Sequence, residues 1–140
     1  MPSSLPTALA AFTSPHDVEQ LRALEQTVRS LTPATFTEQD IRAVLHLFER
    51  FPEDDGYGIF SSLLHAVEAA GGYEKALLES VQRTPAGFNV SMLCRFLNAG
   101  VQQVGGRDLL PLIRDLATRQ DISPRARETA EETLSIYGAR

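Results

Sequence analysis

Apolar residues recur along most of the chain at intervals of three and four positions, the period of a helix that turns one face to a core. One such set follows Thr37 at i, i+3, i+4 and i+7: Ile41, Val44, Leu45 and Phe48. No segment shows the sustained alternation and β-branched enrichment of a strand. The pattern therefore predicts an all-α protein.

Capping residues and helix breakers divide the chain into about seven predicted helices. The expected ranges are 14–31, 38–51, 57–70, 73–83, 89–99, 107–119 and 124–138. Short connections favour antiparallel pairs, and the pairs repeat roughly every 35 to 40 residues, as in a HEAT-like α-solenoid. An irregular helical bundle gives the same spacing. At 140 residues we expect one helical domain, 1–140, in which 1–13 form a flexible N-terminal segment.

Charge narrows the range of partners. The chain has a formal net charge of −5, which argues against nucleic-acid binding, since that needs a basic face. Residues 38–79 hold nine acidic and three basic residues, so the acidity is concentrated there. A cationic partner fits this distribution better.

Cysteine usage and hydropathy indicate the compartment. Cys94 is the single cysteine, which excludes an intramolecular disulfide and suits a reducing environment. The N-terminal residues lack the features of a signal peptide, and no apolar run is long enough to cross a bilayer. We therefore expect a cytoplasmic protein that does not enter a membrane.

Four polar residues are predicted to support the fold: His65, Glu68, Arg95 and Asn98. Arg95 lies in the most apolar helix, where a guanidinium needs a partner, and Glu68 is the natural one. Reversal of either charge is then expected to unfold the chain. His65 would satisfy a buried carbonyl or carboxylate, and Asn98 would close the end of its helix.

The loop from Glu53 to Tyr57 carries three successive acids, which form either a solvated turn or a protein-binding epitope. In the second reading Tyr57 supplies an aromatic contact and the acids receive a basic surface. The predicted partner-binding residues are Glu49, Glu53, Asp54, Asp55, Tyr57 and Glu74.

Catalytic and metal-binding patterns are weak. His65 and Glu68 alone supply too few ligands for a metal, and the acidic loop lacks the spacing of a calcium loop. Cys94 lies among apolar neighbours that disfavour a thiolate. We predict no enzyme activity, no metal and no cofactor.

Several of these residues together resemble the immunity protein 30 family of bacterial polymorphic toxin systems. The resemblance covers about residues 45–115. It is carried by Asp54-Asp55, His65-Ala-Val-Glu68, Tyr73 and Arg95-Phe-Leu-Asn98. Family members favour a tryptophan between the last two elements. This chain has no tryptophan, and Phe88 occupies the corresponding stretch.

The resemblance implies a protein that binds a cognate toxin domain and blocks it. The toxin would then act in the cytosol, and a basic nuclease would suit the acidic segment. The alternative from another class is a HEAT-like scaffold or regulatory adaptor that binds a protein or a peptide. Neither reading sets the oligomeric state.

Overall fold

The structure is a computed structural model and describes residues 5–138. Within this range it has eight α-helices: α1 (Leu5–Ala11), α2 (Val18–Arg29), α3 (Glu38–Arg50), α4 (Ile59–Ala70), α5 (Glu74–Arg83), α6 (Gly87–Asn98), α7 (Leu109–Thr118) and α8 (Pro124–Gly138). Two 3₁₀ turns, η1 (Pro33–Thr35) and η2 (Gly56–Gly58), precede α3 and α4. Two short strands, β1 (Gln103–Val104) and β2 (Arg107–Asp108), pair antiparallel. The all-α prediction is confirmed.

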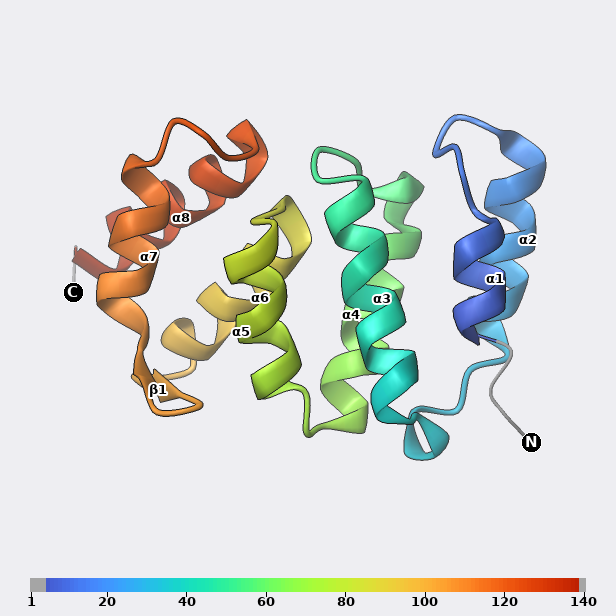
Figure 1. Ribbon diagram of the computed structural model, residues 1–140, viewed down its shortest axis with the longest axis horizontal. Helices are drawn as coiled ribbons and strands as arrows, with labels where there is room; N and C mark the ends of the chain where they lie inside the picture. The colour runs from blue at the N-terminus through green and yellow to red at the C-terminus, as the bar shows by residue number, and fades with distance from the viewer. Residues whose placement is uncertain (1–4, 139–140) are drawn as a thin grey trace.

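The helices form antiparallel pairs that lie side by side in a row (Figure 1). One layer contains α1, α3 and α5 in that order, and the other contains α2, α4, α6 and α8. At the C-terminal end α7 packs on α6 and α8. This row of pairs is the arrangement that the helix spacing favours, while the HEAT-like relationship stays a prediction.

The N-terminal segment is part of the core, which corrects its expected flexibility. Leu5, Leu9 and Phe12 are each 2% exposed and lie at i, i+4 and i+7 along α1 and just past its end. The Arg50 guanidinium of α3 donates hydrogen bonds to the carbonyls of Leu9 (3.2 Å) and Phe12 (2.6 Å). These bonds satisfy carbonyls at the end of α1 and hold it against α3. Residues 1–4 lie outside the described range.

Aromatic rings connect four of the helices at the centre of the row. The Phe60 ring on α4 lies 5.7 Å from Phe48 on α3, 5.8 Å from Phe88 on α6 and 6.2 Å from Phe12 beyond α1, measured between centroids. Phe48 and Phe60 are almost fully buried. Contacts of this kind add to the burial of apolar area, so Phe88 acts as a core anchor.

Two predicted helix starts need correction. The first expected helix begins at Val18 instead of near Ser14, because the Asp17 carboxylate caps it by accepting hydrogen bonds from the N–H groups of Glu19 and Gln20. The sixth expected helix, which is α7, begins at Leu109 instead of Arg107, since Arg107 and Asp108 form β2.

The expected cap at the start of α3 is present. The Thr37 hydroxyl accepts from the Asp40 N–H (3.1 Å), and the Asp40 carboxylate accepts from the Thr37 N–H (2.9 Å). This reciprocal capping box fixes where α3 begins. The helix ends at Arg50, before Pro52, as the sequence predicts.

Candidate partner-binding surfaces

The loop between α3 and α4 exposes a tyrosine in an unusual backbone conformation. Gly56, Tyr57 and Gly58 have φ angles of 54°, 53° and 88°. Among the described residues, Tyr57 is the one non-glycine with positive φ, and it is 75% exposed. The Asp55 carboxylate accepts from the Tyr57 N–H (2.9 Å). A Cβ at Gly56 would lie 2.7 Å from the Phe60 ring, so the loop must pass close to the core at that point.

Asp54 and Asp55 lie beside a shallow pocket of about 280 Å³, next to Phe88, Ser91 and Arg125. Neither aspartate forms an ion pair with any residue of the described range. These two carboxylates, with Tyr57, are the part of the predicted acidic epitope that stays open to a partner.

Glu53 has a structural role instead. Its carboxylate accepts hydrogen bonds from the Ser123 hydroxyl and from the Arg125 N–H at the start of α8 (3.0 Å for the second). A carboxylate at this position also interacts favourably with the helix dipole. The Glu53 oxygen that caps α8 is therefore not available to a partner, while the contact predicted between Glu53 and a partner stays a prediction.

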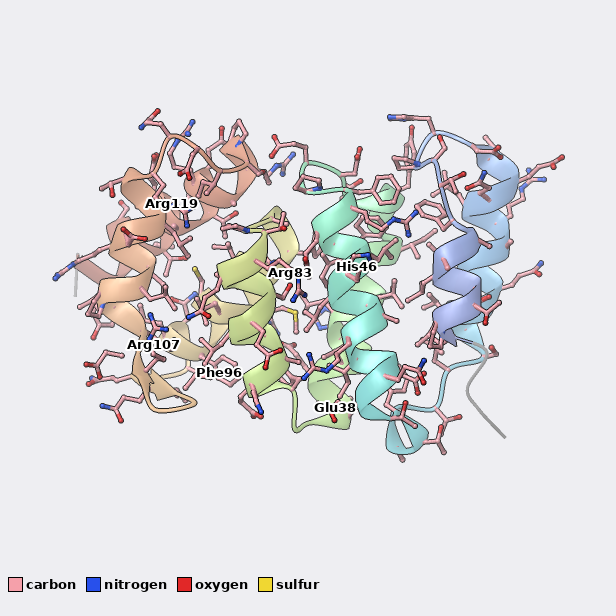
Figure 2. All side chains as sticks on the ribbon, in the orientation of Figure 1. Glu38, His46, Arg83, Phe96, Arg107 and Arg119 are labelled. Carbon is pink, nitrogen blue, oxygen red and sulfur yellow. The ribbon has the colours of Figure 1, made fainter. Side chains whose placement is uncertain are left out.

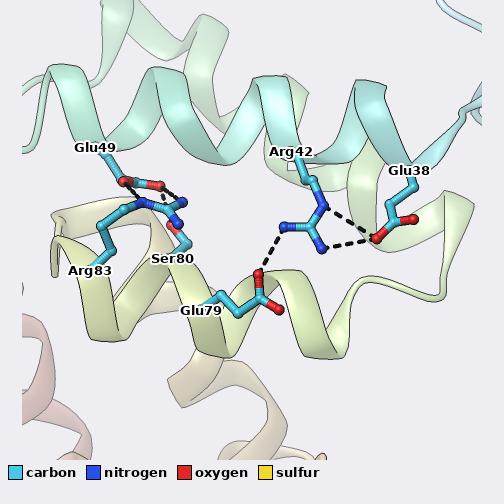
Figure 3. A network of polar contacts seen from close by, with 6 residues as sticks. All are labelled: Glu38, Arg42, Glu49, Glu79, Ser80 and Arg83. Carbon is cyan, nitrogen blue, oxygen red and sulfur yellow. Dashed lines mark hydrogen bonds and ion pairs between the residues drawn. The ribbon is translucent and has the colours of Figure 1, made fainter.

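Glu49 is also unavailable to a partner. It is 8% exposed and faces α5, where Arg83 donates to both carboxylate oxygens at 2.7 Å (Figure 3). The Ser80 hydroxyl donates a further bond to Glu49 (2.8 Å). These bonds raise the pKa of Arg83. The expected epitope residue thus joins α3 to α5.

Asn89 completes this network, and the sequence reading missed it. Its side chain is fully buried and donates to the Ser80 hydroxyl (3.0 Å) and to the Thr84 carbonyl (2.9 Å). Its carbonyl oxygen accepts from the Ala86 N–H (2.7 Å). Asn89 therefore fixes the turn between α5 and α6. The sequence does contain a clue to this role: Asn89 follows Pro85 near the start of a predicted helix, where asparagine side chains often cap free N–H groups.

Four of the nine acidic residues in 38–79 form ion pairs within the fold: Glu38, Glu49, Glu68 and Glu79. Arg42 of α3 pairs with Glu38 (2.9 Å) and with Glu79 of α5 (2.8 Å), as Figure 3 shows. The Arg42 guanidinium lowers the pKa of Glu79. Arg83, from outside the segment, neutralises Glu49. Glu49 is buried in its pair with Arg83, and the other three share their charge with arginines, so these four acids offer a partner less negative charge than composition indicates.

Glu74 is separated from the loop acids. It lies in the first turn of α5, while the loop lies at the start of α4, and the 12 residues of α4 run between these two ends (Figure 1). At 1.5 Å per residue this distance is about 18 Å. Glu74 and Asp54 therefore lie near opposite ends of α4, contrary to a single acidic epitope.

A second surface forms where α4 and α6 end and α5 begins. The predicted contact between Glu68 and Arg95 is present: Arg95 Nε lies 2.7 Å and Nη2 2.9 Å from the two carboxylate oxygens. Their side chains are 20% and 49% exposed, so the pair sits at the surface and not in the interior. The Glu68 carboxylate raises the pKa of Arg95.

His65 and Asn98 differ from their expected roles. The His65 ring is 60% exposed and lies 3.7 Å from Glu68, so it satisfies no buried group. Backbone bonds close α6, with the N–H of Gly100 donating to Leu97 (3.0 Å). Asn98 is exposed, and its amide makes no hydrogen bond to any residue of the described range. It is not the helix-closing residue.

These residues surround one open hollow of about 480 Å³, which we call the α4–α6 hollow. Its main lining residues are Glu68, Tyr73, Met92, Arg95, Phe96 and Asn98. The Tyr73 and Phe96 rings stack at 5.6 Å between centroids. Figure 2 shows Phe96 near the β hairpin, toward the same lower edge of the view as Glu38. The helical residues that carry the family resemblance thus meet at one place.

Tyr73 is strongly affected by these neighbours. Burial raises the pKa of Tyr73 to about 12, and the negative charges of Glu68 and Glu74 add to the rise, while Arg95 opposes it. The hydroxyl therefore keeps its proton at any physiological pH. It is a neutral group that can both donate and accept a hydrogen bond.

Comparison of the chain with models of protein families, with curated proteins and with solved structures gave no match. No cluster of three or more potential ligand side chains that could hold a metal ion occurs in residues 5–138. Over the same range, every helix is too short or too polar to span a bilayer.

Proposed function

We propose that the protein is an immunity protein, which binds a cognate bacterial toxin domain in the cytosol and blocks it without chemistry of its own. The resemblance in Asp54-Asp55, His65 to Glu68, Tyr73 and Arg95 to Asn98 supplies the class of partner. The structure supplies two surfaces on which that partner can rest.

The observation that carries the proposal is Tyr57. A tyrosine that is 75% exposed gains little from the core, and its left-handed backbone conformation costs free energy. Strained residues of this kind occur preferentially at functional sites. Exposed tyrosines also contribute strongly to protein interfaces, because they bury a large area at a small cost in conformational entropy.

Asp54 and Asp55 determine which partner Tyr57 would meet. Their carboxylates have no cation of this chain within ion-pair distance in the described range, and they directly precede the loop residues Gly56 and Tyr57. Electrostatic attraction of this type speeds the association of a basic partner and weakens as salt rises. A basic toxin, such as a nuclease, would fit.

The test is co-expression with the toxin domain encoded next to this gene, scored by growth of a sensitive bacterium and by co-purification. Rescue together with a stable complex supports the proposal. Growth arrest despite soluble expression of both proteins contradicts it.

Mapping of the surface requires variants that leave the fold intact. Asp54→Lys should weaken the complex, most strongly at low salt, because it reverses an unpaired charge. The matched control is Glu132→Lys on α8, at an exposed acid that makes no ion pair in the described range. Equal affinity of the two variants at low salt would remove the loop from the interface. Glu53→Lys is unsuitable, since it removes the cap of α8.

A helical adaptor is the second candidate, supported by a groove between α2 and α4. Val18, Leu21, Tyr57 and Ile59 line this groove, whose volume is about 380 Å³, and Val18 is 59% exposed. Apolar grooves between helices receive amphipathic helices of partner proteins. Loss of a helical-peptide partner on Val18→Asp, with toxin binding unchanged, would favour the adaptor.

A further inference from the structure

The α4–α6 hollow contains a polar group with no partner. Tyr73 is only 7% exposed, yet its hydroxyl makes no hydrogen bond to any residue between 5 and 138. Buried tyrosine hydroxyls normally have a partner. In that range, Asp40 Oδ1 is the one side-chain nitrogen or oxygen that is fully enclosed and lacks a hydrogen bond. The Tyr73 oxygen is therefore not fully enclosed, and a ligand in the hollow, which Tyr73 lines, can reach it.

Other groups around the hollow also have unused capacity. Each Glu68 oxygen accepts one hydrogen bond from Arg95 and has lone pairs for more. The Asn98 amide lines the hollow with neither its oxygen nor its nitrogen engaged by a described residue. Three acceptor groups, a carboxylate, a phenol and an amide, therefore border the same space.

The lining of the hollow carries one negative charge, Glu68, paired with one positive charge, Arg95. Glu74 at the start of α5 adds a negative charge close to Tyr73. Two carboxylates, Glu68 and Glu74, act on Tyr73, against the single guanidinium of Arg95. Glu74 makes no ion pair within residues 5–138 that would cancel it. A ligand with a positive charge and several N–H donors matches this potential and these acceptors.

The aromatic wall favours the same ligand. The Phe96 ring is partly exposed, lies in the wall and is stacked on Tyr73. Cations are attracted to aromatic ring faces, and the alkyl stem of a lysine or arginine packs on apolar carbon.

We propose that the α4–α6 hollow binds a basic side chain, a lysine ammonium or an arginine guanidinium, that the protein partner supplies. This inference rests on the proposed function for the origin of the side chain. The charged head contacts the Glu68 carboxylate, the Tyr73 hydroxyl and the Asn98 carbonyl oxygen. The aliphatic stem lies against Phe96.

The test uses N-acetyl-lysine amide and N-acetyl-arginine amide as probes, added to ¹⁵N-labelled protein and followed by NMR. A basic probe should shift the signals of the Asn98 side-chain amide and of residues 68, 73 and 95–99, with a dissociation constant on the order of 10 mM. N-acetyl-glutamine amide, which is neutral and similar in size, should leave these signals unchanged. Absence of a saturable shift with both basic probes, or equal shifts with the neutral one, overturns the proposal.

Variants identify the groups that bind. Tyr73→Phe keeps the ring stack and removes only the hydroxyl, so affinity for the basic probes should fall about fivefold. Glu74→Gln should lower it about twofold, because it removes one nearby charge. The control Glu132→Gln, on α8, should bind as the parent does. A Tyr73→Phe protein with unchanged thermal midpoint and unchanged affinity would exclude the hydroxyl and overturn the proposed contact.

The probe experiment is independent of the toxin. If the probes fail to bind while the toxin complex forms, this inference is wrong and the proposed function stands. If the probes bind in the hollow and no toxin complex forms, the proposed function fails and the preference of the hollow for basic groups stands.

Discussion

Glu68 and Arg95 join the last turns of α4 and α6 through two parallel hydrogen bonds of 2.7 and 2.9 Å. The pair connects neighbouring helix pairs of the row. Because Arg95 is half exposed, water competes for both groups, and the pair stabilises the fold only modestly.

We therefore expect Arg95→Met to lower the free energy of unfolding by about 1 kcal/mol, measured by urea denaturation. Arg95→Glu should cost about 2 kcal/mol, since it places two carboxylates together, and the exchange Glu68→Arg with Arg95→Glu should recover part of the loss. This revises the expectation from sequence that charge reversal unfolds the chain. An unfolded Arg95→Glu protein at 25 °C would show that the revision is wrong.

Asn89 and Asn98 lie on the same helix, which gives a matched pair of substitutions. Asn89→Ala should lower the free energy of unfolding by about 2–3 kcal/mol, because it leaves buried groups of Ser80, Thr84 and Ala86 without their bonds. Asn98→Ala should change it by less than about 0.5 kcal/mol, as usual for an exposed position. Similar losses for the two variants, in urea or thermal denaturation, would contradict the network.

Tyr57 should lower the free energy of unfolding through its backbone strain and strengthen binding of the toxin through its ring. Tyr57→Gly should raise the free energy of unfolding by about 1 kcal/mol, because glycine adopts positive φ without strain. Tyr57→Ala removes the ring and keeps the strain, so its stability should equal that of the parent. Both variants should bind the toxin more weakly. A gain of stability in Tyr57→Ala as well would assign the effect to the side chain and not to the backbone.

Cys94 should make stability fall at alkaline pH. Burial raises the pKa of the Cys94 thiol, so the folded protein holds this proton more tightly than the unfolded chain does. The resulting stabilisation is complete below the ordinary thiol pKa of about 8.5 and decreases as pH rises above it. Unfolding in urea at several values between pH 8 and 10 should show this slope.

Cys94→Ala is the control for that slope, because it lacks the titrating group while the other ionisable residues are unchanged. Tyr73 contributes only at higher pH, since its ordinary pKa is about 10 and the folded value is raised to about 12. An identical slope in Cys94→Ala between pH 8 and 10 would exclude the thiol as the cause.

The helices and several of their ends follow from local sequence. The period of apolar residues, the capping box of Thr37 and Asp40, and the Ser123-Pro124 start of α8 act within one or two turns. The contact between Glu68 and Arg95 was also predictable, because an arginine in an apolar helix needs a partner and Glu68 follows an apolar run on another predicted helix. Such arguments need no knowledge of the tertiary arrangement.

The acidic epitope could not be predicted in the same way. Composition assigns Glu49, Glu53 and Glu74 to one charged segment. In the fold, Glu49 pairs with Arg83, Glu53 caps the start of α8, and Glu74 lies beyond the far end of α4. The partners of the first two lie 34 and 72 residues away in the chain. Which acid meets which base is decided by how the helices pack.

The sequence by itself determined the all-α class and the order and approximate boundaries of seven of the eight described helices, α1 being the exception, because periodicity and capping depend on residues a few positions apart. Only the tertiary structure decided that the first segment docks through Arg50, that Glu49 pairs with Arg83, and that Glu68, Tyr73, Arg95 and Asn98 border one hollow. These outcomes depend on distances between helices, and no local pattern encodes those distances.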